Sequence, residues 1–291
     1  MDFLLPLLIS GIVTGSAYGL IALGKAIIFK TTDTVNFALA DIATLAAFVA
    51  ITAMHAGLPV VGGLLLAVGI AGVLGVITER LLLRRLARNK HRIFVALVIM
   101  IGLGLVIRAT IGATWGYDPI KFPALIPGTV TFAGVSIALN KILATGMALV
   151  AMAFVAWFFT RTSFGVAMRA SAEDPFAARL VGINANLVAS IAWFIGCGLA
   201  AISIFFLAAD SALSPMFALI PLFRALAGVF LGGLTSMPGA VLGGFAIGML
   251  DNLAAGYVSA SFRDTIVFSV IVLVLFIRPE GILGKVKVER V

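Results

Sequence analysis

Apolar segments of about 20 residues recur along the chain, separated by short polar stretches. They cover roughly residues 3–24, 37–54, 58–78, 93–112, 141–160, 188–208 and 265–278. Two shorter segments, Phe217–Leu231 and Ala240–Leu250, precede the last of these. A helix of about 20 apolar residues crosses the ~30 Å hydrocarbon core of a bilayer. The pattern therefore predicts an all-α fold, a polytopic transmembrane helical bundle in which residues 1–291 form a single transmembrane domain.

Glycine and proline interrupt this pattern between the two short segments, where residues 232–239 read Gly-Gly-Leu-Thr-Ser-Met-Pro-Gly. A polar stretch, residues 30–36, interrupts it near the N-terminus, just before an apolar run that contains Asp41. Broken helices at membrane depth occur where protein buries them or where they line a wet cavity, as in many transporters. We therefore expect interrupted or re-entrant helices. The candidate residues of a translocation path are Asn36, Asp41, Arg224, Gly232, Gly233, Pro238 and Gly239.

Basic residues orient the predicted spans. Six of them lie in the short connection Glu79–Arg92, so this connection is expected in the cytoplasm. Counting spans from this connection places three further segments on the inside: Lys25–Thr34, Arg161–Asn184 and the basic tail Arg278–Val291. The same count places outside the N-terminus, His55–Pro59, Ala113–Asn140 and Ala209–Pro215. The number of crossings is then odd: seven or nine, depending on whether the two short segments cross.

The composition excludes an ordinary soluble domain, because 62% of the residues are hydrophobic, 11% are charged and the mean hydropathy is +1.21. The net charge of +8 would suit nucleic acid, but the basic residues lie mainly at the ends of apolar segments. We therefore interpret the charge as a topology signal and expect no nucleic acid partner. The single cysteine, Cys197, lies in an apolar run and allows no disulfide within the chain.

Four ionisable residues lie in apolar surroundings, where an unpaired charge is costly. Arg108 is near the outer end of its segment, and we expect its side chain to extend to the interface. Asp251, beside Asn252, is expected at a hydrated helix end. Asp41 and Arg224 are expected to face the protein interior.

The sequence offers little for catalysis or nucleotide binding. Residues 19–25 match most of a phosphate-binding loop, but Ala26 replaces the required Ser or Thr and no strand precedes the motif. Only two histidines occur, and no motif for a catalytic, cofactor or metal site appears. Gly11, Gly15 and Gly19 recur every fourth residue, as do three later glycine pairs. This spacing indicates close helix packing.

One short helix is predicted in the inside segment Arg161–Asn184. Asp174 suits the N-cap, Pro175 the first helical position and Gly182 a left-handed end. Seven helical residues span about 10 Å, too little to cross a bilayer. Phe176, Ala177, Leu180 and Val181 share one apolar face. Such a helix either lies on lipid or docks into a groove of a cytoplasmic partner.

Several motifs in order resemble the branched-chain amino acid permeases of bacterial ABC importers, in particular the shorter of their two permease types. The motifs lie at residues 15–24, 31–38, 164–183, 231–244, 262–264 and 278–284 and cover nearly the whole chain. The chain departs from the family where Leu39-Ala40, followed by Asp41, replaces a common His-Gly pair, and where Arg224 replaces a usual Lys.

The resemblance implies a multi-pass permease of the bacterial inner membrane that moves branched-chain or other hydrophobic amino acids. The implied partners are a second permease subunit, identical or different, two cytoplasmic ATPases and a periplasmic substrate-binding protein. The chain itself is then no enzyme and needs no cofactor. The short helix becomes the coupling helix to the ATPase, with Glu173, Asp174, Pro175, Phe176, Ala177, Arg179, Leu180 and Gly182.

Two alternatives stay open. Related permeases carry urea, amides or other small solutes. A secondary transporter that needs no ATPase would also use interrupted helices.

Overall fold

A computed structural model describes residues 4–86, 92–123, 125–132, 135–278 and 280–284, and it confirms the all-α helical bundle. Its helices are α1 (Leu4–Thr32), α2 (Leu39–His55), α3 (Val60–Thr78), α4 (Arg84–Leu86), α5 (Arg92–Trp115), α6 (Leu139–Arg161), α7 (Ser163–Glu173), α8 (Pro175–Leu180), α9 (Ala185–Asp210), α10 (Leu219–Gly232), α11 (Met237–Tyr257) and α12 (Arg263–Ile277). A π-helical turn, Glu79–Leu83, joins α3 to α4, and a 3-10 turn, Ala260–Phe262, precedes α12.

Two small antiparallel sheets accompany the helices. Strand β1 (Ile120–Lys121) pairs with β4 (Ala212–Leu213), with Ile120 opposite Leu213. Strand β2 (Thr129–Phe132) pairs with β3 (Val135–Ala138), with Val130 opposite Ile137. Both sheets lie in the connections that were predicted outside the membrane.

Seven helical stretches of the described chain are long and apolar enough to cross a membrane, and α2 and α10 are shorter, with 17 and 14 residues. The short segment Phe217–Leu231 corresponds to α10. The prediction of a second short segment, Ala240–Leu250, is wrong, because α11 has 21 residues. Ser236 caps α11 by accepting a hydrogen bond from the Gly239 amide at 3.1 Å, and Pro238 fits the first turn. The helix therefore starts before its apolar run.

The first helix also extends further than predicted. Lys25 was expected to begin a cytoplasmic connection, but α1 continues to Thr32 and Lys25 is only 2% exposed. Its ammonium group donates a hydrogen bond to the Asn36 carbonyl oxygen at 3.0 Å, which compensates for its burial. Residues 19–25 are thus one continuous stretch of helix.

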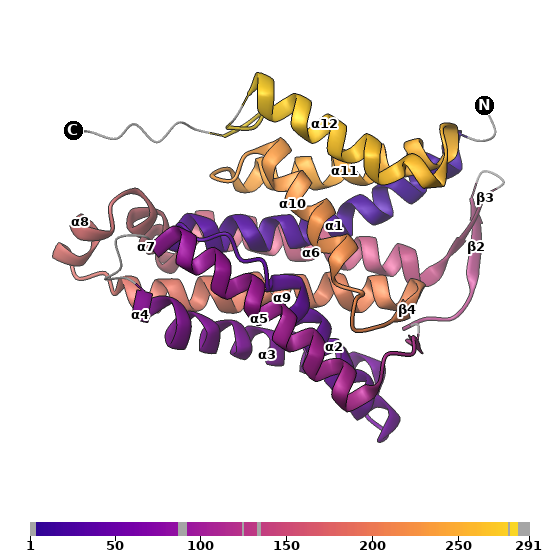
Figure 1. Cartoon of the computed structure of the whole chain (residues 1–291), viewed down its shortest axis with the longest axis horizontal. Coiled ribbons are helices and arrows are strands. Elements are labelled where there is room, and N and C mark those ends of the chain that lie inside the picture. The colour runs from indigo at the N-terminus through magenta and orange to yellow at the C-terminus, as the bar shows by residue number, and fades with distance from the viewer. Residues whose placement is uncertain (1–3, 87–91, 124, 133–134, 279, 285–291) are drawn as a thin grey trace.

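The helices form a layered bundle around α1 and α9 (Figure 1). Helices α2, α3 and α5 lie on one side of this central pair, and α10, α11 and α12 lie on the other. Helices α4, α7 and α8 gather at one end of the bundle, and the strands gather at the opposite end. Arg84 donates a hydrogen bond to the Asn186 carbonyl oxygen at 2.8 Å across the first end. The described parts of the connections predicted inside therefore share one end, and the described parts of those predicted outside share the other.

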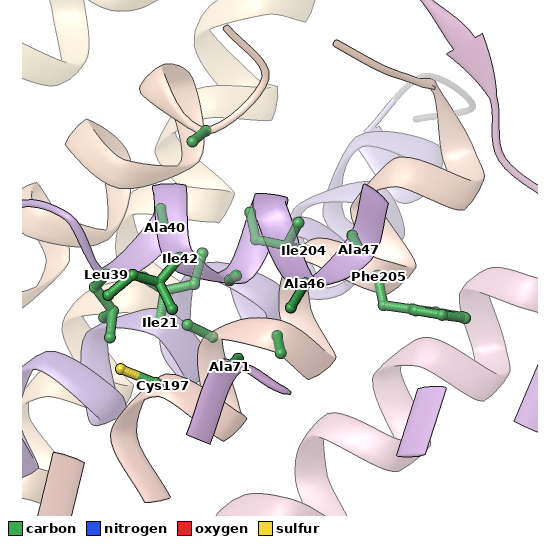
Figure 2. Close-up of a cluster of buried hydrophobic side chains, with 14 of the residues drawn as sticks. Ile21, Leu39, Ala40, Ile42, Ala46, Ala47, Ala71, Cys197, Ile204 and Phe205 are labelled. Atoms are coloured by element: carbon green, nitrogen blue, oxygen red, sulfur yellow. The ribbon is translucent and has the colours of Figure 1, made fainter. Parts of the chain in front are cut away.

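The largest apolar core joins α1, α2, α3 and α9 (Figure 2). In this core Ile21, Ala46 and Ala71 lie close to the segment Cys197–Phe205 of α9. Most side chains that α2 contributes are alanine, so the helix axes approach closely and leave little room for voids. Cys197 is completely buried, as its apolar context predicts.

Glycines set the closest contacts of α1 with its neighbours. A Cβ atom added to Gly248 of α11 would lie 2.2 Å from the Gly15 Cα atom, and one on Gly244 would lie 2.4 Å from that of Gly19. On its other face, Gly24 packs against Gly196 of α9. The predicted role of the four-residue glycine spacing in close helix packing is confirmed.

Candidate translocation site

A cavity of about 220 Å³ lies between α1, α6, α9 and α11 and reaches Arg263 at the start of α12. Its outer rim carries an ion pair between the Lys141 ammonium nitrogen and an Asp210 carboxylate oxygen, 3.1 Å apart. These side chains are 34% and 48% exposed. Lys141 lies near the beginning of α6 and Asp210 at the end of α9, next to the strands. The rim therefore faces the end of the bundle that is predicted to be periplasmic.

The floor of the cavity lies deeper in the bundle. Leu20, Ala148 and Ser203 reach it from three different helices and are each at most 2% exposed. The Ser203 hydroxyl donates a hydrogen bond to the Ala17 carbonyl oxygen at 2.8 Å, which joins α9 to α1 below the cavity. This contact closes the inner side of the cavity between α1 and α9.

A polar wall between α1 and α11 completes the cavity. The Asn252 side-chain amide donates hydrogen bonds to the Thr14 hydroxyl at 2.7 Å and to the Gly248 carbonyl oxygen at 2.9 Å. The opposite wall is apolar, with Ala144 and Phe206. The cavity thus combines charged, polar and apolar surfaces in one space.

A network of charges lies beside the cavity, centred on Asp251. The guanidinium group of Arg263 binds both Asp251 carboxylate oxygens at 2.6 Å, and Arg224 approaches at 3.2 Å. Arg224 also contacts Asp264 at 3.0 Å and donates a hydrogen bond to the Tyr18 hydroxyl at 2.9 Å. The expected burial of Arg224 is confirmed, with 8% exposure.

The expectation that Asp251 lies hydrated at a helix end is wrong. The residue is completely buried, and α11 continues for six residues beyond it, to Tyr257. Two arginines, from α10 and α12, replace the water that a carboxylate would otherwise need.

Arg108 also differs from its prediction. Its guanidinium group turns inward and binds both carboxylate oxygens of Asp41, at 2.7 and 2.9 Å. Asp41 is 1% exposed, as expected of an inward-facing group. A Cβ atom on Gly104 would lie 2.6 Å from the carboxylate, so this glycine leaves room for the pair. Charge neutralisation across α2 and α5 outweighs extension to the interface, because each buried charge requires a partner.

Asn36 lies in the polar interruption before α2 and is 1% exposed. Its carbonyl oxygen accepts the hydrogen bond from Lys25, and neither polar atom of its side-chain amide has a partner within the described residues. Asn36 thus lies before α2 and Asp41 in its first turn, and neither residue lines the cavity described above.

The glycine-rich break forms a tight turn between α10 and α11. Gly232 and Gly239 face each other so closely that a Cβ atom on Gly232 would lie 1.8 Å from the Gly239 carbonyl oxygen. Gly233 ends α10 with φ +105°, a conformation that favours glycine. The Ile282 and Leu283 amides donate to the carbonyl oxygens of Leu231 and Gly232 at 2.8 and 3.0 Å. Protein therefore buries much of this break, although Pro238 in the same turn is exposed.

The short predicted helix is present as α8. The Asp174 carboxylate accepts hydrogen bonds from the amides of Phe176 and Ala177 at 2.8 and 3.0 Å, and Gly182 has φ +83°. The helix has six residues and ends at Leu180, one residue earlier than predicted. Phe176, Leu180 and Val181 are 68%, 73% and 77% exposed, so the expected apolar face is present and uncovered in this chain.

The rim and walls of the cavity were not predicted from the sequence. Thr14, Lys141, Asp210 and Arg263 come from four helices, and no local motif connects them. The only sequence signal for the rim is that Lys141 and Asp210 flank apolar segments on the same predicted side of the membrane. Many loop residues share this feature.

These features define a polytopic membrane protein of the transport class, with a polar cavity between its helices and an exposed capped helix at one end. Residues 7–277 match the model of the family described as branched-chain amino acid transport system permease component. The chain belongs to this family.

Named relatives match along nearly the whole chain. The high-affinity branched-chain amino acid transport system permease protein BraD of Pseudomonas aeruginosa is 31% identical over 98% of this chain and 97% of its own length. Permease protein LivH of the corresponding system in Escherichia coli K12 is 28% identical over 99% and 98%. A probable branched-chain amino acid transport permease protein LivH of Methanocaldococcus jannaschii is 27% identical over 91% and 88%.

Proposed function

We propose that the chain is the transmembrane permease subunit of an ATP-driven ABC importer and moves branched-chain and other hydrophobic amino acids across the bacterial inner membrane. The names of its relatives support this substrate class, and their match extends over nearly the full length. A second permease subunit would complete the pathway, and a periplasmic binding protein would deliver the solute. ATP hydrolysis would take place on two separate cytoplasmic ATPase subunits.

The observation that carries the ATP-driven part of the proposal is the uncovered apolar face of α8. A helix of only six residues is costly to order in isolation, even with a well-formed N-cap. Its three large apolar side chains also gain no stability from exposure to water. Docking into a groove of an ATPase subunit removes these side chains from water. The candidate contact residues include Glu173, Asp174, Pro175, Phe176, Ala177, Arg179, Leu180 and Gly182.

A hydrogen-bonded turn and one long helix connect α8 to the cavity. The Ile183 amide donates to the Ala178 carbonyl oxygen at 3.0 Å, and the Asn184 side chain caps α9 by accepting from the Leu187 amide at 3.1 Å. Helix α9 then runs for 26 residues, about 39 Å at 1.5 Å per residue, past the cavity floor to its rim. We expect a displacement of α8 by ATPase closure to be transmitted along α9 toward Ser203.

Substitution of the α8 anchor tests the proposal. Phe176→Ala removes apolar area worth about 1.5–3 kcal/mol on burial, which corresponds to about a tenfold or greater loss of ATPase affinity. Asp174→Ala is expected to act more mildly, by about 1 kcal/mol of helix stability. The measurements are ATPase co-purification and substrate-stimulated hydrolysis in the reconstituted importer.

Phe276→Ala is the matched control, because this phenylalanine is 91% exposed on α12, within a candidate membrane span. It should leave ATPase association unchanged. Full association and full coupling in Phe176→Ala would identify α8 as a lipid-facing cap and would favour a secondary transporter. If the wild-type importer takes up urea or amides and not leucine, the ATP-driven mechanism stands and the proposed substrate class is wrong.

A further inference from the structure

We infer that the cavity between α1, α6, α9 and α11 is a binding site for one zwitterionic aliphatic amino acid, with its charged head group at the Lys141–Asp210 rim and its side chain pointing inward. The inference rests on the proposed function and adds to it the position and orientation of the solute. Neither rim residue belongs to the candidate path that the sequence indicated.

The charges at the rim match the solute in kind. A free α-amino acid carries an ammonium group and a carboxylate on neighbouring atoms. Lys141 and Asp210 offer the complementary pair 3.1 Å apart, and both remain partly exposed to an incoming solute. The Asp210 carboxylate is positioned to accept hydrogen bonds from the solute ammonium, and the Lys141 ammonium to donate to its carboxylate. A solute with only one of these charges satisfies only one rim residue.

The interior of the cavity matches an aliphatic side chain. From Asp210 to Ser203 along α9, and from Lys141 to Ala148 along α6, the chain advances seven residues, or about 10 Å. Over that depth the wall formed by α6 and α9 changes from charged residues to Ala144, Ala148 and Phe206, whereas the wall formed by α1 and α11 stays polar. A branched aliphatic group placed there leaves water for an apolar wall, which favours binding.

The volume also suits a small solute. Pockets for drug-sized ligands measure roughly 300–1,000 Å³. The 220 Å³ found here lies below that range and suits a molecule of amino-acid size. The floor is closed by the hydrogen bond from Ser203 to the Ala17 carbonyl oxygen, so the site is open toward the strand end and closed toward the α8 end. This arrangement suits a solute received from outside and held before release.

Protection of a cysteine in the cavity tests occupancy directly. Ala144→Cys, in the complete importer, places a thiol on the apolar wall, and the native Cys197 is completely buried and adds no background. A small impermeant thiosulfonate applied from the outer side is expected to label this cysteine. L-Leucine should slow the labelling at least fivefold, whereas isopentylamine and 4-methylpentanoate, which each lack one of the charges, should not.

Rim variants then test the head-group contacts. Lys141→Gln and Asp210→Asn should each weaken leucine protection about tenfold or more, in line with the loss of a charge-assisted hydrogen bond. Lys121→Gln and Asp118→Asn are matched controls, because both residues are exposed at the same end of the bundle and lie outside the cavity. They should leave protection unchanged.

A charge exchange separates binding from a purely structural ion pair. In the double variant Lys141→Asp, Asp210→Lys the pair can form again, so thermal stability should return to the wild-type value. Leucine protection should also recover above that of either single neutral variant, because both charged groups of the solute are bonded to its Cα atom and can exchange places by rotation about the side-chain axis. Recovery of thermal stability without any recovery of leucine protection would assign the pair a structural role only and would overturn the inference.

The outcomes distinguish this inference from the proposed function. An importer that hydrolyses ATP and takes up leucine, but shows no leucine protection at Ala144→Cys or no labelling there, would overturn the cavity site and keep the function. Leucine protection without any ATPase association would keep the site and overturn the ATP-driven mechanism.

Discussion

Every buried carboxylate in the described part of the chain contacts an arginine. Asp41 binds Arg108, Glu79 binds Arg84 at 2.6 Å, and Asp251 binds Arg263 and Arg224. A charge in the bundle interior loses its hydration, and only a well-oriented partner compensates for that loss. Single residues thus fix which helices lie together, because an unpaired charge in any other arrangement costs several kcal/mol.

The two aspartates that share Arg224 allow a matched test of this effect. Asp251 is completely buried, whereas the Asp264 side chain is 64% exposed. Asp251→Asn leaves two arginines without a buried counter-charge and should lower the free energy of unfolding by about 3 kcal/mol or more. Asp264→Asn should lower it by less than about 1 kcal/mol. Denaturation of the purified protein in detergent, followed by circular dichroism, measures both values. Equal losses would contradict the assignment of Asp251 as the centre of the network.

The sequence indicated which residues were unusual, but it did not indicate their partners. Asp41 and Arg224 could be selected because charges in apolar segments are costly. Arg108 and Asp251 were misplaced because their partners come from other helices, 67 and 12 positions along the chain. Pairing at such distances depends on helix packing, which no local pattern encodes.

At the scale of helices, close approach through glycine holds α11 against α1. Gly244 and Gly248 face Gly19 and Gly15, and the backbones touch without intervening side chains. In a bilayer, where burial of apolar surface between helices gains little, such backbone contact and van der Waals packing supply much of the association. These two helices also form walls of the cavity.

A methyl group at this contact should separate the helices. In Gly248→Ala the new Cβ atom meets the Gly15 Cα atom at 2.2 Å, and we expect a loss of about 1–3 kcal/mol from overpacking. Gly146→Ala is the control, because nothing lies within 4 Å of its new Cβ atom on α6. It should be neutral or stabilise the protein by up to about 1 kcal/mol. Thermal unfolding in detergent compares the two, and a neutral Gly248→Ala would contradict the close contact.

Helix positions followed from the sequence more readily than helix ends. The apolar runs located every long helix, because about 20 apolar residues in succession have few other uses. The ends of α1 and α11 were wrong because Lys25 finds a carbonyl partner inside the bundle and Ser236 caps its helix before the apolar run begins. The cavity was missed because its residues come together only when five helices are packed.

At the scale of the whole molecule, the two ends of the bundle differ in structure. One end holds the pair of β1 and β4 together with the cavity rim. The other holds α8 and the hydrogen bonds that join Arg84 to Asn186 and Ser190. Basic residues predict that this second end faces the cytoplasm. Two of the six basic residues of Glu79–Arg92, Arg88 and Lys90, lie outside the described residues.

Cysteine labelling determines the orientation. Lys121→Cys at the strand end and Arg161→Cys at the end of α6 place exposed thiols at opposite ends of the bundle. Because basic connections are retained inside, we expect an impermeant maleimide to label Lys121→Cys in intact spheroplasts and Arg161→Cys only after the membrane is permeabilised. A Cys197→Ala background serves as the unlabelled control. If only Arg161→Cys is labelled in intact spheroplasts, the topology is the reverse of the predicted one. The cavity would then open to the cytoplasm, and α8 would be unable to reach a cytoplasmic ATPase.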